Sequence, residues 1–141
     1  MSSDPWKLSE HDVSRLNDSL ERCVRKPEFL ERFYDLFLKS SEDVRNMFVG
    51  TDFRRLKRQL KHSLYVMLLA ASGNEEAWRE MDARAVRHDR NHLNVRPPLY
   101  ELWLHCLVTA VSECDAKCDP DIERIWRTVM RRGIEYMIER Y

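Results

Sequence analysis

The segment from Asp52 to Gly73 has an apolar residue at every third or fourth position, and this spacing constrains the fold more than any other feature. Leu56, Leu60, Leu64 and Met67 share one face in an α-helix, which repeats every 3.6 residues, whereas the period of two in a β-strand would put Met67 on the opposite face. The opposite face is rich in Arg and Lys, so we expect it to lie in water. Asp52 and Gly73 are residue types that begin and end helices. The segment therefore predicts a long amphipathic helix.

The same spacing recurs along the rest of the chain, and we expect further helices over about 9–26, 27–38, 41–48 and 75–91, from 97 and from 119. Ser9, Ser41 and Asp119 are suitable caps, and Pro27 and Pro97 suit first helical positions. The helix over 75–91 has a weaker pattern and no strong cap. The chain contains only three glycines and five prolines, and no strand-like alternation persists. We predict an all-α domain of six or seven helices over 1–141, with the last two antiparallel.

The charge balance narrows the range of partners. Twenty-four basic residues offset twenty-four acidic ones, which argues against nucleic acid or an anionic membrane surface as a partner. No apolar run approaches the roughly 20 residues that span a bilayer, and the N-terminus lacks signal-peptide character. We therefore expect a cytoplasmic protein whose four cysteines are reduced thiols.

Two aromatic residues mark a likeness to a known family. Tyr34 follows Phe33 and lies fourteen residues ahead of Phe48, with Val44-Arg45 between them. This pattern is similar to the ligand-binding segment of bacterial haemoglobins and of the globin domains of flavohaemoglobins. The resemblance implies that Tyr34 faces a gas ligand and that Phe48 packs against a haem.

A second segment carries the same likeness. Ala85-Val86-Arg87-His88 resembles the stretch that ends in the proximal histidine, and residues 88–100 read His-x-Arg-x-x-Leu-Asn-Val-x-Pro-x-Leu-Tyr. The chain thus resembles bacterial single-domain globins, which are related to flavohaemoglobins and globin-coupled sensors. The resemblance implies a globin fold with haem b, iron held by His88, Val95 near the haem, and Tyr100 orienting the imidazole. The interval from His88 to Tyr100 is longer than in flavohaemoglobins.

His92 is an alternative iron ligand, one turn after His88. It lies only eight residues before Tyr100, which is too short for the family pattern. We expect His92 to lie at the rim of the pocket instead. There it would contact a haem propionate together with Arg87 or Arg90.

Periodicity alone leaves open which residues of the segment after Asp52 face the haem. Either Leu60 and Leu64 or Gln59 and Ser63 satisfy the spacing. We expect Leu60 and Leu64 there, with Met67 further along. Gln59 would instead place a second hydrogen-bond donor beside Tyr34.

The resemblance implies reversible binding of O2, and of NO or CO, at the haem iron. It also implies an alternative activity, NO dioxygenation with electrons from an external reductase. A third alternative is a gas-sensing or haem-free globin that acts on a signalling partner. Each of these functions is compatible with a homodimer.

Overall fold

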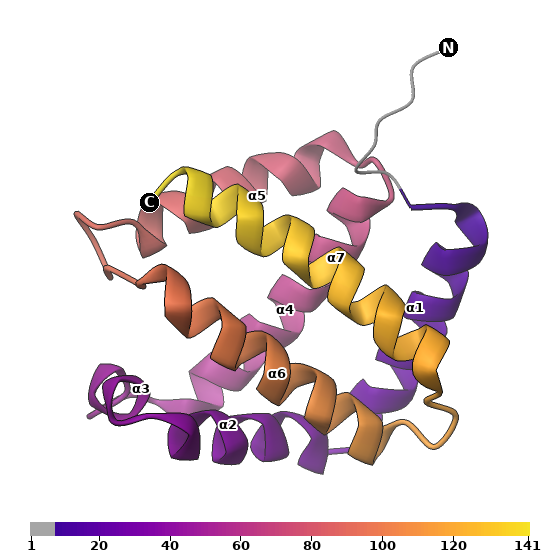
Figure 1. The fold of residues 1–141 in the computed structure, drawn as a ribbon, viewed down its shortest axis with the longest axis horizontal. Coiled ribbons are helices and arrows are strands. Elements are labelled where there is room, and N and C mark those ends of the chain that lie inside the picture. The colour runs from indigo at the N-terminus through magenta and orange to yellow at the C-terminus, as the bar shows by residue number, and fades with distance from the viewer. Residues whose placement is uncertain (1–7) are drawn as a thin grey trace.

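The structure is a computed structural model that describes residues 8–141. The chain in this range folds into helices joined by short connections, with no strand among the described residues (Figure 1). The helices are α1 (Glu10–Val24), α2 (Glu28–Ser40), α3 (Glu42–Met47), α4 (Phe53–Ala71), α5 (Glu75–His88), α6 (Pro97–Cys114) and α7 (Pro120–Glu139). The predicted all-α class is confirmed, and the count is seven.

Three of the predicted caps form as expected. The side chains of Ser9, Ser41 and Asp119 each accept the main-chain amide three residues further on, at 3.1, 3.0 and 2.8 Å. Each bond satisfies one of the amides that a helix start leaves without a partner. Local chemistry therefore sets where α1, α3 and α7 begin.

Helix α5 differs from the prediction at both ends. Its start is capped after all, because the side chain of Asn74 accepts the amide of Ala77 at 3.0 Å. It ends at His88 rather than near Asn91, because Asp89 turns to an extended conformation with ψ of 173°. The Asp89 carboxylate then accepts the amide of Asn91 at 2.9 Å. The end of α5 thus coincides with His88.

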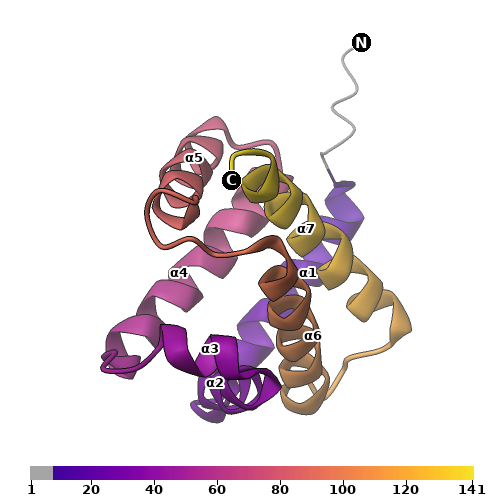
Figure 2. The same ribbon diagram turned by 60° about the vertical axis from the view of Figure 1, so that its left-hand side comes forward.

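The helices pack around one apolar core. α2 packs on α6, while α5 lies between α4 and α7. Figure 1 shows α6 and α7 side by side with opposite chain directions, as predicted, and α4 behind them. Figure 2 shows the connection that leads from the end of α5 to the start of α6. The indole of Trp126 and the ring of Phe29 are fully buried in this core.

One polar network is buried with the core and joins α1 to the end of α6 and to α7. Asp115 is 2% exposed and accepts bonds from Ser19 at 2.6 Å and from the Nε of Arg22 at 2.5 Å. Ser19 in turn accepts the indole N–H of Trp126 at 2.9 Å. Burial alone would raise the pKa of Asp115, but the bonds from Arg22 and Ser19 hold it below its usual value.

The four cysteines, Cys23, Cys106, Cys114 and Cys118, are free thiols. Within residues 8–141, no helix is both long enough and apolar enough to cross a bilayer.

Candidate functional site

His88 is the last residue of α5, and its ring is half-buried. Its Nδ1 lies 2.7 Å from the main-chain oxygen of Arg84, one turn earlier. A carbonyl only accepts, so Nδ1 carries the proton and Nε2 keeps a lone pair. Burial is the main cause that lowers the pKa of His88, and the charges of Arg87 and Arg84 lower it further. The ring is therefore neutral at pH 7 and able to bind a metal through Nε2.

The connection after α5 folds back on this histidine. The amide of Val95 donates to the main-chain oxygen of His88 at 3.0 Å, and that of Leu93 donates to Arg87 at 3.0 Å. Asn94 makes this turn with a left-handed φ of 51°, which Asn tolerates better than most residues. The half-buried Val95 side chain packs against the core.

His92 lies on the outside of this connection. Its Nδ1 is 2.7 Å from the carboxylate of Asp89, and its side chain is 54% exposed. The bond from His92 lowers the pKa of Asp89. His92 is therefore the more exposed of the two histidines, and His88 is half-buried.

Tyr34 lies on α2 and is 8% exposed. Its hydroxyl donates to the main-chain oxygen of Leu56 on α4 at 3.2 Å. Burial raises the pKa of Tyr34, so the phenol keeps its proton at neutral pH. An O–H···O distance of 3.2 Å exceeds the usual 2.7 to 2.8 Å, which marks this bond as a weak one.

Phe48 caps the end of α3 and belongs to a cluster of aromatic rings. Its centroid lies 6.1 Å from that of Tyr34, 6.0 Å from Phe37 and 6.2 Å from Phe53. The first two pairs meet edge to face, the arrangement that aromatic quadrupoles favour. Phe48 and Phe53 are only half-buried, so each leaves apolar surface beside the Tyr34 ring.

The two alternative pairs on α4, Leu60 with Leu64 and Gln59 with Ser63, lie in different surroundings. Leu60 and Leu64 are buried in the core, at 7% and 0% exposed. Gln59 is exposed, and Ser63 is half-buried at the contact between α4 and α5. Ser63 thus approaches the helix that carries His88, while Leu60 and Leu64 pack on the apolar side of α4.

Arg84 is a site residue that the sequence reasoning missed. Its side chain is 12% exposed, and its Nε donates to the hydroxyl of Ser63 at 3.0 Å. The signal that could have found it is its spacing, because a residue four positions before His88 lies on the same helix face. Arg84 lies in an Arg-rich segment, in which charged side chains are ordinarily expected to be exposed to solvent.

Tyr100 is 8% exposed, and burial raises its pKa to about 12. The second cause of that shift is Tyr141, which the sequence reasoning also missed. The Tyr141 hydroxyl donates to the side chain of Asn94, and its main-chain oxygen accepts the amide of Arg90 at 3.2 Å. The Arg90 guanidinium lies 4.9 Å from the centroid of the Tyr141 ring. Tyr141 therefore ties the end of the chain to the connection that follows His88.

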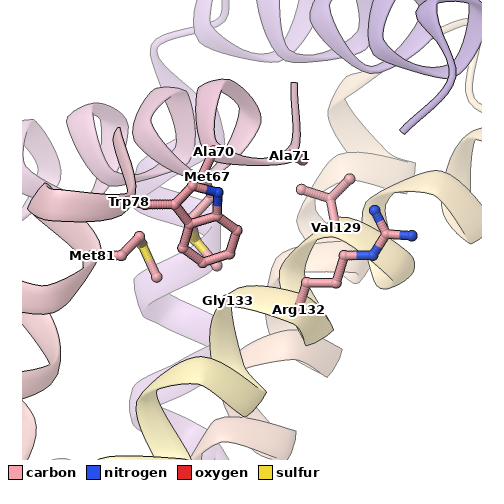
Figure 3. Close-up of a pocket in the computed structure, with 8 residues that line it drawn as sticks. All are labelled: Met67, Ala70, Ala71, Trp78, Met81, Val129, Arg132 and Gly133. Carbon is pink, nitrogen blue, oxygen red and sulfur yellow. The ribbon is translucent and has the colours of Figure 1, made fainter. Parts of the chain in front are cut away.

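A small cavity lies between α4, α5 and α7, lined by side chains that include Met67, Trp78 and Met81 (Figure 3). Its volume is about 10 Å³, enough for one water-sized molecule. Gly133 forms one wall, where an added Cβ would overlap the Cε of Met67. Met67, which we expected near the haem, thus lies against α7 at Gly133.

The residues around His88 suit a haem. A neutral imidazole offers Nε2 as an axial ligand, and its Nδ1–H has the acceptor that fixes the ring. Half-buried apolar side chains from three segments, Phe48, Leu56 and Val95, offer surface for a macrocycle. Arg87 and His92 are exposed and of the residue types that pair with carboxylates such as propionates. The donor set and the lining therefore fit the group.

Comparison with known proteins gives one solved structure with a close likeness. It is protein PA3967 from Pseudomonas aeruginosa PAO1, described as structurally highly homologous to a human hemoglobin. The two sequences are 35% identical, the TM-score is 0.88, and the match covers 92% of this chain and 98% of the other. No family model matches the chain, and no curated protein does.

This level of identity over nearly the whole of both chains is far beyond a shared helical architecture alone. The predicted globin arrangement of helices is confirmed with it. The chain belongs to the globin family and groups with its bacterial single-domain members.

Proposed function

We propose that the protein is a haem b globin that reversibly binds O2, with NO and CO as further diatomic ligands. The observation that carries the proposal is the bond from His88 Nδ1 to the main-chain oxygen of Arg84 at 2.7 Å, which leaves Nε2 as a metal ligand. A bound haem would supply an iron able to bind a diatomic molecule, and His88 would hold that iron. The chain supplies the ligand, the walls and a hydrogen-bond donor.

Tyr34 is the proposed donor. Its present bond to Leu56 is long, and that oxygen already lies within the hydrogen-bond ladder of α4. A hydroxyl rotates freely about its C–O bond, so the phenol can exchange this weak acceptor for a polarised diatomic ligand. A donor in an apolar pocket stabilises such a ligand and slows its release.

The remaining proposed contacts form the walls. Phe48 at the end of α3, Val95 just before α6 and Tyr100 on α6 would contact the macrocycle. Leu60 and Leu64 of α4 would contact it as well. Arg87 and His92 pair with the propionates by charge-assisted bonds. Met67 belongs to the lining only if its side chain leaves Gly133.

The test is a titration of the purified apoprotein with haemin, followed by the Soret absorbance. We expect stoichiometric binding by the wild type and by His105→Ala, and a lost or strongly weakened band with His88→Ala. His105→Ala is the control, because it removes an exposed imidazole of α6 that has no part in the proposed site. Equal spectra from the two variants, or no band from the wild type, would contradict the proposal.

A further inference from the structure

Arg84 is a charged side chain in an unusual place. Only 12% of it is exposed, because it lies between α5 and α4. Its Nε donates to Ser63 at 3.0 Å, and its Nη1 donates to the main-chain oxygen of Glu80 at 3.4 Å. Burying a guanidinium costs free energy that one hydroxyl and one carbonyl only partly offset.

The charge of Arg84 is only partly neutralised. The nearest carboxylate is that of Glu80, 3.6 Å away, and its side chain is 50% exposed. Glu80 also lies 3.2 Å from the imidazole of His62, so it is shared between two partners. Burial lowers the pKa of Arg84, but a guanidinium remains protonated at any pH where the protein is folded. A net positive potential therefore persists between the two helices.

Arg84 lies one turn before His88 on the same helix, and its main-chain oxygen lies 2.7 Å from the imidazole Nδ1. Burial, then the charge of Arg87 and then that of Arg84 lower the pKa of the imidazole. Arg87 acts on the same ring, but its side chain projects into solvent, where salt screens it. Arg84 is shielded from solvent, so its effect on the ring is less sensitive to salt.

A nearby cation affects the two oxidation states of a haem unequally. Ferric haem carries one more positive charge than ferrous haem, so a fixed cation destabilises the ferric form more. Charges and dipoles around the axial ligand are a principal means by which a protein sets the potential of an iron. The ferrous form is the one that binds O2.

We propose that Arg84 is a positioning residue that biases the haem iron toward the ferrous state by holding a largely buried positive charge one helical turn before His88 on α5. The inference rests on the proposed function, because it requires His88 as the axial ligand. The equilibrium concerned is the gain of one electron by the iron, supplied in the experiment by a chemical mediator. Glu80 opposes the effect, and Ser63 holds the guanidinium in place.

The experiment is a spectroelectrochemical titration of the holoprotein at about 0.5 M salt, where exposed charges are screened. Arg84→Gln should lower the ferrous-to-ferric ratio at a given potential about tenfold, which is a fall of about 59 mV in midpoint potential. Arg84→Lys keeps the charge and should restore most of the wild-type ratio. Arg79→Gln is the matched control, because it removes an exposed guanidinium from the same helix. It should change the ratio less than about twofold.

Glu80→Gln gives a test of opposite sign that leaves Arg84 in place. It removes the opposing charge, so the ratio should rise, by less than the fall caused by Arg84→Gln because Glu80 is half-exposed. A midpoint that is unchanged in Arg84→Gln, or that falls equally in Arg79→Gln, would overturn the inference. A wild type without a Soret band would instead overturn the proposed function.

Discussion

Ser63 on α4 and Arg84 on α5 are joined by a hydrogen bond of 3.0 Å from Nε to the hydroxyl oxygen. This bond connects α4, which carries Leu60 and Leu64, to the helix that ends at His88. It also supplies one of the few polar partners of a guanidinium that is 12% exposed. The spacing of the two helices therefore depends on a polar contact as well as on apolar packing.

Removal of this contact should destabilise the apoprotein. Ser63→Ala leaves the Nε of Arg84 without its acceptor in a half-buried place, and we expect a loss of about 1 to 2 kcal/mol in the free energy of unfolding. Urea denaturation measures it. Ser112→Ala is the control, because Ser112 is exposed and bonds only to its own helix, at Thr109. Equal losses in both variants would show that the bond across the helices adds nothing.

The phenol of Tyr34 should slow the release of O2. Tyr34→Phe removes the donor without changing the ring, and we expect the dissociation rate to rise about tenfold, which corresponds to ~1.4 kcal/mol. Stopped-flow displacement of O2 by CO measures this rate. Tyr65→Phe is the control, because its hydroxyl donates to Glu21 at 2.5 Å in the contact between α4 and α1. An unchanged rate in Tyr34→Phe would remove the phenol from the ligand site.

Asp115 should contribute to stability in a pH-dependent manner. Its folded pKa lies below its usual value, so its contribution is present above the unfolded pKa of 3.8 and is lost as pH falls through the folded pKa. Asp115→Asn should cost about 3 kcal/mol at pH 7, because it breaks a buried pair with Arg22. The cost should shrink as the pH approaches 3. Chemical denaturation over a pH series measures both effects.

The matched control is Glu113→Gln. Its pair with Arg32 is more than 40% exposed on both sides, so we expect a cost below about 1 kcal/mol at pH 7. If Asp115→Asn cost no more than this variant, the buried network would not act as a stabilising unit.

Gly133 should accept a methyl group only if Met67 moves aside. Gly133→Ala places that methyl group against the Cε of Met67, the far end of a flexible side chain, and Ala favours the helix over Gly by about 1 kcal/mol, so we expect a net cost below about 1 kcal/mol. A double-mutant cycle with Met67→Ala isolates the contact, because the substitution at Gly133 should cost less once that side chain is shortened. Additive costs would place the strain elsewhere than in this pair.

Tyr141 should hold the connection after His88 in place. Tyr141→Ala removes the bond to Asn94 and the stacking of Arg90, so haem loss to an acceptor apoglobin should accelerate several-fold. Tyr136→Ala is the control, because Tyr136 stacks on Arg140 and Trp78 on another part of the α7 surface. Similar rates in the two variants would show that Tyr141 has no special role.

The helices could be predicted from the sequence because their signals are local. Ser9, Ser41 and Asp119 act within one turn, and apolar spacing marks the buried face. The end of α5 could not be predicted, because it depends on the extended turn at Asp89 and on later residues that fold back on His88. Asn74 was missed as a cap because the pattern after it was weak.

Some residues of the candidate site could be predicted from the sequence and others could not. His88, Tyr34 and Phe48 could be proposed as candidates because they occur at spacings similar to those of a known family. Arg84 and Tyr141 were not, because their roles depend on how separate segments meet. The arginine run that contains Arg84 reads as a solvated surface until the approach of Ser63 is known.

The acceptor that fixes the ring of His88 is a main-chain oxygen, which every amino acid carries. The side chain at position 84 can therefore change without altering which nitrogen of the imidazole keeps its lone pair. Position 84 fixes the ring through its main chain and sets the nearby charge through its side chain. Exchange of this arginine would change that charge in a single substitution and leave the bond to the imidazole in place.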